Sequence, residues 1–170
     1  MNVALLFGRK NSKSIKNKNI LKIFSKEMFM YPIDAAKKSK FINKIYVSSD
    51  SNYILKKAHN EGCEIIYRPK YLCNDKALLE DAIQHAVNYC QNKNNYLIKN
   101  FVILLCNSIC VNYKEIDKGF NILAKNKKFD TVTTVSKFNN FSPVRSKKIK
   151  GKQLLNYITN STLKRFTPLS

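Results

Sequence analysis

The sequence predicts an α/β domain of three layers built on a mostly parallel sheet. Short apolar runs, which indicate buried strands, alternate along the chain with segments whose apolar residues have helical spacing. Strands that alternate with helices in this way pair in parallel through right-handed crossovers. The 170 residues are the length of one domain, and the 44% of hydrophobic residues suffice for a sizeable core. We therefore expect a single domain over residues 1–170.

Five apolar runs are the expected strands. The run Phe101–Leu105 contains no polar residue, which predicts a central strand that is covered on both faces. The five expected strands are Val3–Phe7, Lys44–Ser48, Cys63–Tyr67, Phe101–Leu105 and Thr131–Val135.

Four segments between these runs are the expected helices. The first has its regular part from near Tyr31, because Pro32 is tolerated in a first turn but breaks a helix already under way. The second is stopped by Gly62, a helix terminator. The expected helices lie within Lys26–Ser39 and at Ser51–Asn60, Leu78–Cys90 and Tyr113–Ala124, with loops at residues 70–77 and 91–99.

The net charge of +20 could indicate a nucleic acid or another polyanion as partner. The lysines are scattered over the whole length, however, with no basic tail and no arginine cluster, which argues against a nucleic-acid role. The milder inference is an affinity for ligands that carry phosphate.

The cysteines and the apolar runs indicate in which cellular compartment the protein is expected. The five cysteines are odd in number and match no zinc spacing, so we expect free or buried thiols in a reducing compartment. No apolar run approaches the roughly 20 residues of a membrane span, and no secretory leader is evident. We therefore expect a cytoplasmic protein.

The loop after the first run is rich in groups that bind phosphate. Val3–Phe7 turns at Gly8 into a basic segment in which hydroxyl and amide side chains add neutral donors. Sheets of this class bind ligands beyond the carboxyl ends of their strands. The segment is neither a P-loop nor a dinucleotide fingerprint, and an exposed basic turn stays the alternative. The phosphate-binding candidates are Arg9, Ser12, Lys13, Lys16, Lys18 and Asn19.

Four segments, in this order along the chain, resemble the motifs of a known family. They are Gly8-Arg9-Lys10-Asn11-Ser12-Lys13-Ser14 with Lys18-Asn19-Ile20, Tyr31-Pro32-Ile33-Asp34-Ala35-Ala36-Lys37-Lys38-Ser39, Val47-Ser48-Ser49-Asp50, and Arg68-Pro69-Lys70-Tyr71-Leu72-Cys73-Asn74-Asp75. Over about residues 3–150 the chain resembles the cytidylyltransferases that activate acidic and amino sugars, typified by CMP-sialic acid synthetase.

The resemblance implies a Rossmann-like, GT-A-like nucleotidyltransferase domain and a reaction. A sugar hydroxyl attacks the α-phosphate of a nucleoside triphosphate, expected to be CTP, and pyrophosphate leaves. The product would be a CMP-linked sugar acid or amino sugar for surface-polysaccharide or glycoconjugate biosynthesis. The resemblance also implies Mg²⁺ as the cofactor and a homodimer as the assembly.

The same resemblance implies which residues form the site. Arg9 and Lys13 would hold triphosphate oxygens and are the expected catalytic residues. The other members of the set would fix the position of the nucleotide. The expected nucleotide-binding residues are Gly8, Arg9, Ser12, Lys13, Lys18, Asn19 and Arg68.

The chain departs from the family pattern at two places. Lys10, Asn11 and Ser14 stand where the family has loop glycines, so the loop either adopts an unusual backbone shape at some cost or changes its form. Cys106 stands where the family has a glutamine that helps to read cytosine. A thiol cannot present the donor and acceptor of an amide, which leaves the base open.

The metal ligands are less clear from the sequence. The resemblance places the family's acidic pair beyond this chain, so we expect a domain truncated at its C-terminus, with residues 137–170 as the start of a dimerisation arm or an irregular tail. Asp50 is the candidate ligand because Mg²⁺ prefers carboxylate oxygens, and a helix N-cap is its alternative role. Further acidic candidates are Asp75, Glu80 and Asp81.

Two other functions stay open at this point. The chain could be a nucleotide-binding remnant of the family that has lost catalysis. It could also be a basic α/β module that binds nucleic acid, with aromatic residues stacking on bases. The aromatic candidates are Tyr67, Tyr71 and Phe138.

Overall fold

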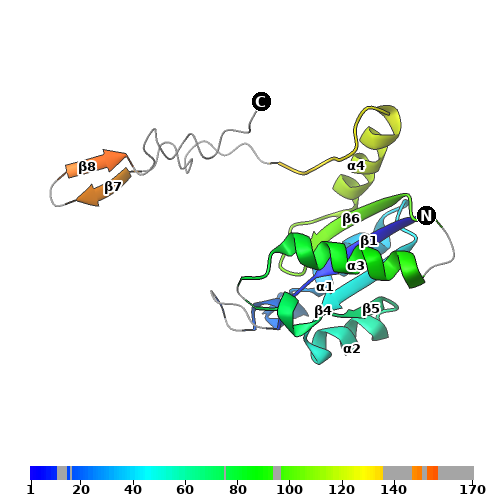
Figure 1. Ribbon diagram of the computed structural model, residues 1–170, viewed down its shortest axis with the longest axis horizontal. Helices are drawn as coiled ribbons and strands as arrows, with labels where there is room; N and C mark the ends of the chain where they lie inside the picture. Colours follow the sequence, from blue (N-terminus) through cyan, green and yellow to red (C-terminus); the bar gives the residue numbers. More distant parts are fainter. Residues whose placement is uncertain are drawn as a thin grey trace. The chain divides into compact units, whose positions relative to one another are not determined.

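The computed structural model describes residues 1–10, 15, 17–74, 76–93, 97–135, 147–150 and 153–156. The chain divides into two compact units, Met1–Val132 and Thr133–Ser170. The first unit is built on a parallel sheet with helices packed against it, which confirms the predicted fold class (Figure 1).

Four parallel strands form the sheet that the described residues of the first unit make. In the order β5-β4-β1-β6, they are Glu64–Tyr67, Lys44–Ser49, Asn2–Phe7 and Asn100–Leu105. β1 lies between β4 and β6, and its last residue, Phe7, pairs with Ser48 on one side and with Leu105 on the other. The carboxyl ends of these three strands therefore meet at one edge of the sheet.

Helices cover both faces of the sheet, so the unit has three layers. The helices are α1 (Met30–Lys38), α2 (Asn52–Asn60), α3 (Leu79–Lys93) and α4 (Tyr113–Lys125). Successive side chains of β1 point to opposite faces. Ala4 and Leu6 pack with residues of α1, α2 and α4, whereas Val3 and Leu5 pack with residues of α3, which crosses the sheet in Figure 1. All four β1 side chains are fully buried.

The helix boundaries follow from local signals in the sequence. Ser51 caps α2, its side chain accepting from the backbone N–H of Ile54 at 3.4 Å. Gly62, just after α2, has φ = 78°, a left-handed conformation that glycine adopts freely. Pro32 lies in the first turn of α1, as predicted. α3 continues to Lys93, into a segment that the sequence predicts as a loop.

The position of β6 differs from the prediction. The sequence predicts Phe101–Leu105 as a central strand, but β6 is an edge strand of the sheet that the described residues form. Ile103 and Leu105 are 39% and 37% exposed. A continuous apolar run indicates a need for burial, but it does not state where the strand stands in the sheet.

The expected strand at Thr131–Val135 is also wrong. These residues form no strand, and they are exposed. Their β-branched side chains fit a pleated surface, but that preference takes effect only when a neighbouring strand is available to pair. Whether a strand finds a partner depends on the tertiary fold, which the composition of five residues cannot predict.

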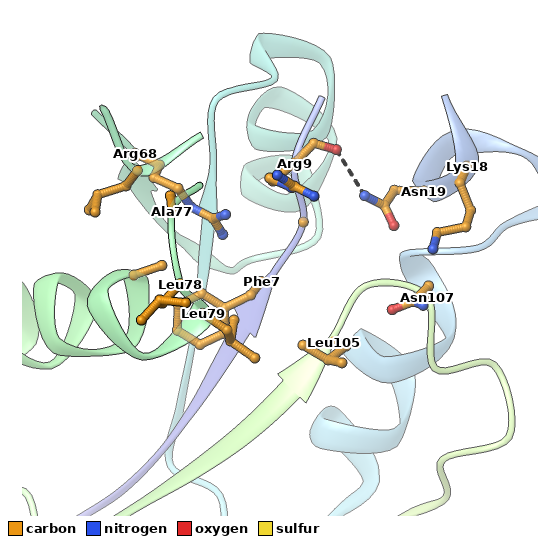
Figure 2. A pocket seen from close by; sticks show the side chains of 13 residues that line it. Phe7, Arg9, Lys18, Asn19, Arg68, Ala77, Leu78, Leu79, Leu105 and Asn107 are labelled. Atoms are coloured by element: carbon orange, nitrogen blue, oxygen red, sulfur yellow. Dashed lines mark hydrogen bonds between the residues drawn. The ribbon is translucent and has the colours of Figure 1, made fainter. Parts of the chain in front are cut away.

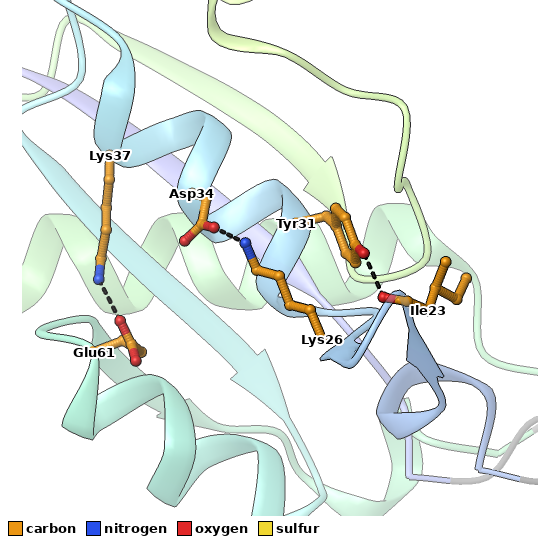
Figure 3. A network of polar contacts seen from close by, with 6 residues as sticks. All are labelled: Ile23, Lys26, Tyr31, Asp34, Lys37 and Glu61. Carbon is orange, nitrogen blue, oxygen red and sulfur yellow. Dashed lines mark hydrogen bonds and ion pairs between the residues drawn. The ribbon is translucent and has the colours of Figure 1, made fainter.

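A small hairpin precedes α1 and was not predicted. β2 (Lys22–Ile23) pairs antiparallel with β3 (Lys26–Glu27), and the turn residues Phe24 and Ser25 have φ of 48° and 65°. Turns of this kind usually carry Asn or Gly, so the sequence gives no turn signal here. Two contacts hold the hairpin on α1: the hydroxyl of Tyr31 donates to the carbonyl of Ile23 at 2.5 Å, and Lys26 pairs with Asp34 (Figure 3).

Two short 3₁₀ helices flank the region where the strands end, η1 (Lys18–Ile20) and η2 (Lys70–Leu72). In the second unit, β7 (Lys147–Lys150) pairs antiparallel with β8 (Gln153–Asn156). Among the helices that the structure describes, none is both long enough and apolar enough to cross a membrane.

Candidate nucleotide site

A pocket of about 240 Å³ lies where the strands of the sheet end (Figure 2). It is bounded by the ends of β1 and β6, the residue after β5, η1, and the segment that leads into α3. Its described lining residues are Phe7, Gly8, Arg9, Lys18, Asn19, Arg68, Leu72, Ala77, Leu78, Leu79, Ala82, Leu105 and Asn107. This is the place where parallel α/β sheets bind ligands.

One wall of the pocket is apolar. It consists of residues before and within the first turns of α3, together with the ring of Phe7. Leu78 and Leu79 are 61% and 39% exposed, although each is large and apolar. Exposed apolar side chains beside a cavity offer contact area to a flat ring such as a nucleobase.

The charged side chains that line the pocket are all cationic. Arg9, Lys18 and Arg68 come from three different elements, and no acidic side chain is among the described residues that line the pocket. Arg9 donates from Nη1 to the carbonyl of Asn74 at 3.0 Å, which ties the loop after β1 to the loop after η2. A concave site with three positive charges attracts phosphate groups.

Arg68 is built into the wall rather than exposed on it. Nη2 donates to the carbonyl of Ser48 at 2.8 Å and Nε to its hydroxyl at 3.3 Å. The guanidinium carbon lies 5.5 Å from the centre of the Phe7 ring. Burial lowers the pKa of Arg68 from its usual value, and an arginine still carries its charge at neutral pH. Arg68 is therefore a fixed cation.

Asn19 shapes the loop after β1. Its side-chain Nδ2 donates to the carbonyl of Arg9 at 2.9 Å, and its own carbonyl accepts from the N–H of Phe29 at 3.0 Å. Asn19 is 8% exposed. It thus links the loop to the hairpin segment and helps to set the backbone from which Arg9 projects.

Gly8 forms the floor of the pocket and lies directly over Cys106. A Cβ at Gly8 would lie 2.7 Å from the Sγ of Cys106, closer than such atoms can approach. Cys106 is fully buried, and burial raises the pKa of its thiol to about 12. Cys106 is therefore a neutral packing residue, and its side chain does not line the pocket.

Asp50, which follows the neighbouring strand β4, binds the loop after β1. Its Oδ1 accepts from the backbone N–H of Lys10 at 2.7 Å. The alternative role of Asp50 as a helix N-cap is wrong, because Ser51 caps α2. In the part of the chain that the structure describes, no group of three or more His, Cys, Asp or Glu side chains could hold a metal. The role of Asp50 as a metal ligand stays a prediction.

The structure brings together the predicted nucleotide-binding residues that it describes. Gly8, Arg9, Lys18, Asn19 and Arg68 all line this pocket, while Ser12, Lys13 and Asp75 lie outside the described residues. Sequence reasoning missed the apolar wall, Leu105 and Asn107. The last two follow the rule that residues at a strand's carboxyl end reach the site, which could have indicated them.

A parallel sheet with a cationic pocket at its strand ends is typical of nucleotide-binding α/β proteins. The profile of one family, described as cytidylyltransferase, matches residues 3–150. The chain belongs to the cytidylyltransferase family.

Individual relatives agree with the family. The chain is 34% identical over 145 residues to a Helicobacter pylori protein named pseudaminic acid cytidylyltransferase and UDP-2,4-diacetamido-2,4,6-trideoxy-beta-L-altropyranose hydrolase, covering 85% of this chain and 27% of that protein. It is 41% identical over 70 residues to the CMP-N,N'-diacetyllegionaminic acid synthase of Campylobacter jejuni, covering 41% of this chain and 30% of the synthase.

A solved structure shares the fold. It is that of a CMP:2-keto-3-deoxy-manno-octonic acid synthetase complexed with CTP, with a TM-score of 0.62 and 13% identity over 74% of this chain and 48% of the synthetase. The chain thus spans less than a third of the two relatives by sequence and about half of this structural neighbour.

Proposed function

We propose that this protein transfers CMP from CTP to a hydroxyl of a nonulosonic, sialic-type sugar acid, releasing pyrophosphate, in the biosynthesis of surface polysaccharides or glycoconjugates. The observation that carries the proposal is the pocket itself: three cations from separate elements face an apolar wall at the strand ends. Family membership supports the reaction type, and the named relatives support a sugar acid as acceptor.

The reaction needs positioning and neutralisation of charge more than covalent chemistry. The acceptor hydroxyl attacks the α-phosphorus, its oxygen forms a new P–O bond, and the bond to pyrophosphate breaks. In our proposal, Arg9 and Lys18 offset the negative charge of the phosphates, and Lys13 shares this role. Arg68, rigid in the wall, fixes the position of the nucleotide against the apolar side chains.

A divalent cation, in our proposal Mg²⁺, would neutralise phosphate oxygens and polarise the reacting phosphate. Asp50 is the candidate protein ligand. One of its oxygens accepts from the backbone N–H of Lys10, and the carboxylate also interacts with the thiol of Cys73, so a cation would compete with that thiol for the carboxylate. Mg²⁺ is often held by one or two carboxylates together with phosphates, so a single carboxylate is consistent with such a site.

Asp50→Asn tests the metal role, because the amide keeps an oxygen for the Lys10 N–H but loses the charge. We expect this variant to bind CTP in the presence of a chelator as the wild type does, and to lose most pyrophosphate release with Mg²⁺. Asp50→Ala should weaken both, since it also frees the loop. Full turnover by the asparagine variant would show that the metal site lies elsewhere.

The overall test is pyrophosphate release from each nucleoside triphosphate with Mg²⁺ and N-acetylneuraminate, legionaminate or pseudaminate. We expect release with CTP and one of these acids, together with a CMP-sugar detected by mass spectrometry. Incubation without the acid is the control.

One alternative rests on the described residues, which contain no group of three or more His, Cys, Asp or Glu side chains that could hold a metal ion. A catalytically impaired nucleotide-binding remnant would bind CTP and release no pyrophosphate with any of the acids. We further propose a homodimer, which sedimentation of the purified protein would check, and a cytoplasmic location, which fractionation of the source cells would check.

A further inference from the structure

The pocket wall at the end of β6 carries a side chain with no assigned role, Asn107. Exposure alternates along this segment: Leu104 and Cys106 are buried, whereas Leu105 and Asn107 are exposed. The alternation directs Cys106 under Gly8 and leaves Asn107 at the pocket. In Figure 2, Asn107 and Leu105 stand on the opposite side from Arg68 and Leu78.

Asn107 differs in chemistry from the rest of the polar lining. Of the described lining residues, only Asn19 and Asn107 have neutral polar side chains. The Nδ2 of Asn19 is occupied by the carbonyl of Arg9, whereas no hydrogen bond joins the Asn107 side chain to another described residue. A carboxamide offers two donors and an acceptor, which suits hydroxyl and amide groups but does not neutralise phosphate.

The geometry of the reaction leaves one side of the pocket for the acceptor. The base fits the apolar wall beside Arg68, and the phosphates fit Arg9 and Lys18. The attacking oxygen must approach roughly in line with the leaving pyrophosphate, so the acceptor cannot share the side of the pyrophosphate. The β6 side, with Leu105 and Asn107, lies opposite the apolar wall and on the same side as Lys18 in Figure 2, so an acceptor there would lie beside the bound phosphates.

We propose that Asn107 binds the acceptor sugar, its carboxamide hydrogen-bonding to hydroxyl or acylamino groups of the sugar acid, and that it contributes to acceptor specificity. This inference rests on the proposed transferase function. It gives a role to the side-chain amide of Asn107, which lies at the end of β6 directly after the buried Cys106.

The test compares Michaelis constants for the two substrates in the pyrophosphate assay, using Asn107→Ala, Asn107→Asp and the control Asn121→Ala on the exposed surface of α4. We expect Asn107→Ala to raise KM for the sugar acid about three- to tenfold, the range for a neutral hydrogen bond, and to leave KM for CTP within about twofold. Asn121→Ala should change neither. The Asn107 variants should unfold at the wild-type temperature because Asn107 is exposed, and Asn121→Ala at the same temperature or slightly above it because alanine favours a helix interior.

Asn107→Asp distinguishes a sugar contact from a phosphate contact. A carboxylate facing the triphosphate would raise KM for CTP about tenfold or more, and this result would overturn the inference. An unchanged sugar-acid KM in Asn107→Ala would overturn it as well, with the transferase function intact. Absence of pyrophosphate release by the wild type, with every acid, would instead refute the proposed function and the inference with it.

Discussion

At the scale of single residues, Gly8 shows how the pocket floor restricts the sequence. It follows β1 directly, and its N–H donates to the carbonyl of Ser48 at 3.2 Å, so the backbone is held on the neighbouring strand. Cys106 fills the space below it. The absence of a side chain at Gly8 thus permits close packing on Cys106 and leaves no side chain between the backbone and a ligand in the pocket.

Gly8→Ala is expected to lower the free energy of unfolding by about 1–3 kcal/mol, because the new methyl group would meet Sγ of Cys106 at 2.7 Å. The matched control is Gly119→Ala within α4, where the nearest atom would be 3.8 Å away. This control should be stabilising by about 0.5–1 kcal/mol, as alanine favours a helix interior. Chemical denaturation of both variants measures the difference, and equal effects would contradict the contact argument.

Arg9→Ala should weaken CTP binding by about 1.5–3 kcal/mol, the range for hydrogen bonds that involve a charged group. Isothermal titration calorimetry measures the change. Lys56→Ala on the exposed face of α2 removes the same charge away from the pocket and should leave the affinity nearly unchanged. Equal losses in the two variants would mean that only the net charge of the protein matters.

At the scale of elements, the hairpin β2–β3 contains the least favourable local conformation that the structure shows outside glycine. Phe24 is a bulky residue with φ = 48°, and its side chain is 95% exposed. Bulky residues rarely adopt this region. The contacts of Tyr31 and Lys26 with their partners hold the hairpin against this cost.

The double replacement Phe24→Asn with Ser25→Gly is expected to stabilise the protein by about 1 kcal/mol, since these residues favour left-handed turns and the exposed ring contributes little burial. Thermal unfolding measures the gain. The single change Ser25→Val, which puts a β-branched residue at φ = 65°, should have the opposite sign. A lower melting temperature in the double variant would show that the ring of Phe24 has a structural contact.

Local signals explain which elements could be predicted. The strand at Val3–Phe7, the cap at Ser51 and the terminator at Gly62 are encoded within a few residues, and the structure agrees with each. The edge position of β6 depends on which strands pair, and the hairpin turn has no turn residues, so neither could be predicted. At the site, the basic loop was evident, whereas the apolar wall forms only when α3 packs beside β1.

At the scale of the whole molecule, the described pocket lies entirely within the first unit. Every described residue that lines it comes before Val132, where this unit ends. The core clusters on both faces of the sheet belong to the same unit. The unit therefore has the core that independent folding requires, and it contains the whole described lining of the pocket that we propose to bind the nucleotide.

A chain of residues 1–132 should unfold cooperatively. It should also bind CTP with an affinity within about twofold of that of the full-length chain, which is a smaller change in binding free energy than the 1.4 kcal/mol of a tenfold difference. Calorimetric titration of the two chains makes the comparison. A loss of about tenfold or more would assign part of the nucleotide site to residues 133–170.

The sealed thiol of Cys106 has a consequence for chemical labelling. Alkylating reagents attack thiolates, and a fully buried thiol with a pKa of about 12 reacts only after the protein around it opens. Cys110, a few residues further on, is exposed and reacts without such an opening. The alkylation rate of Cys106 relative to that of Cys110 thus reports how often the packing between Gly8 and Cys106 opens. A ligand bound against Gly8 would slow the alkylation of Cys106 and leave that of Cys110 unchanged.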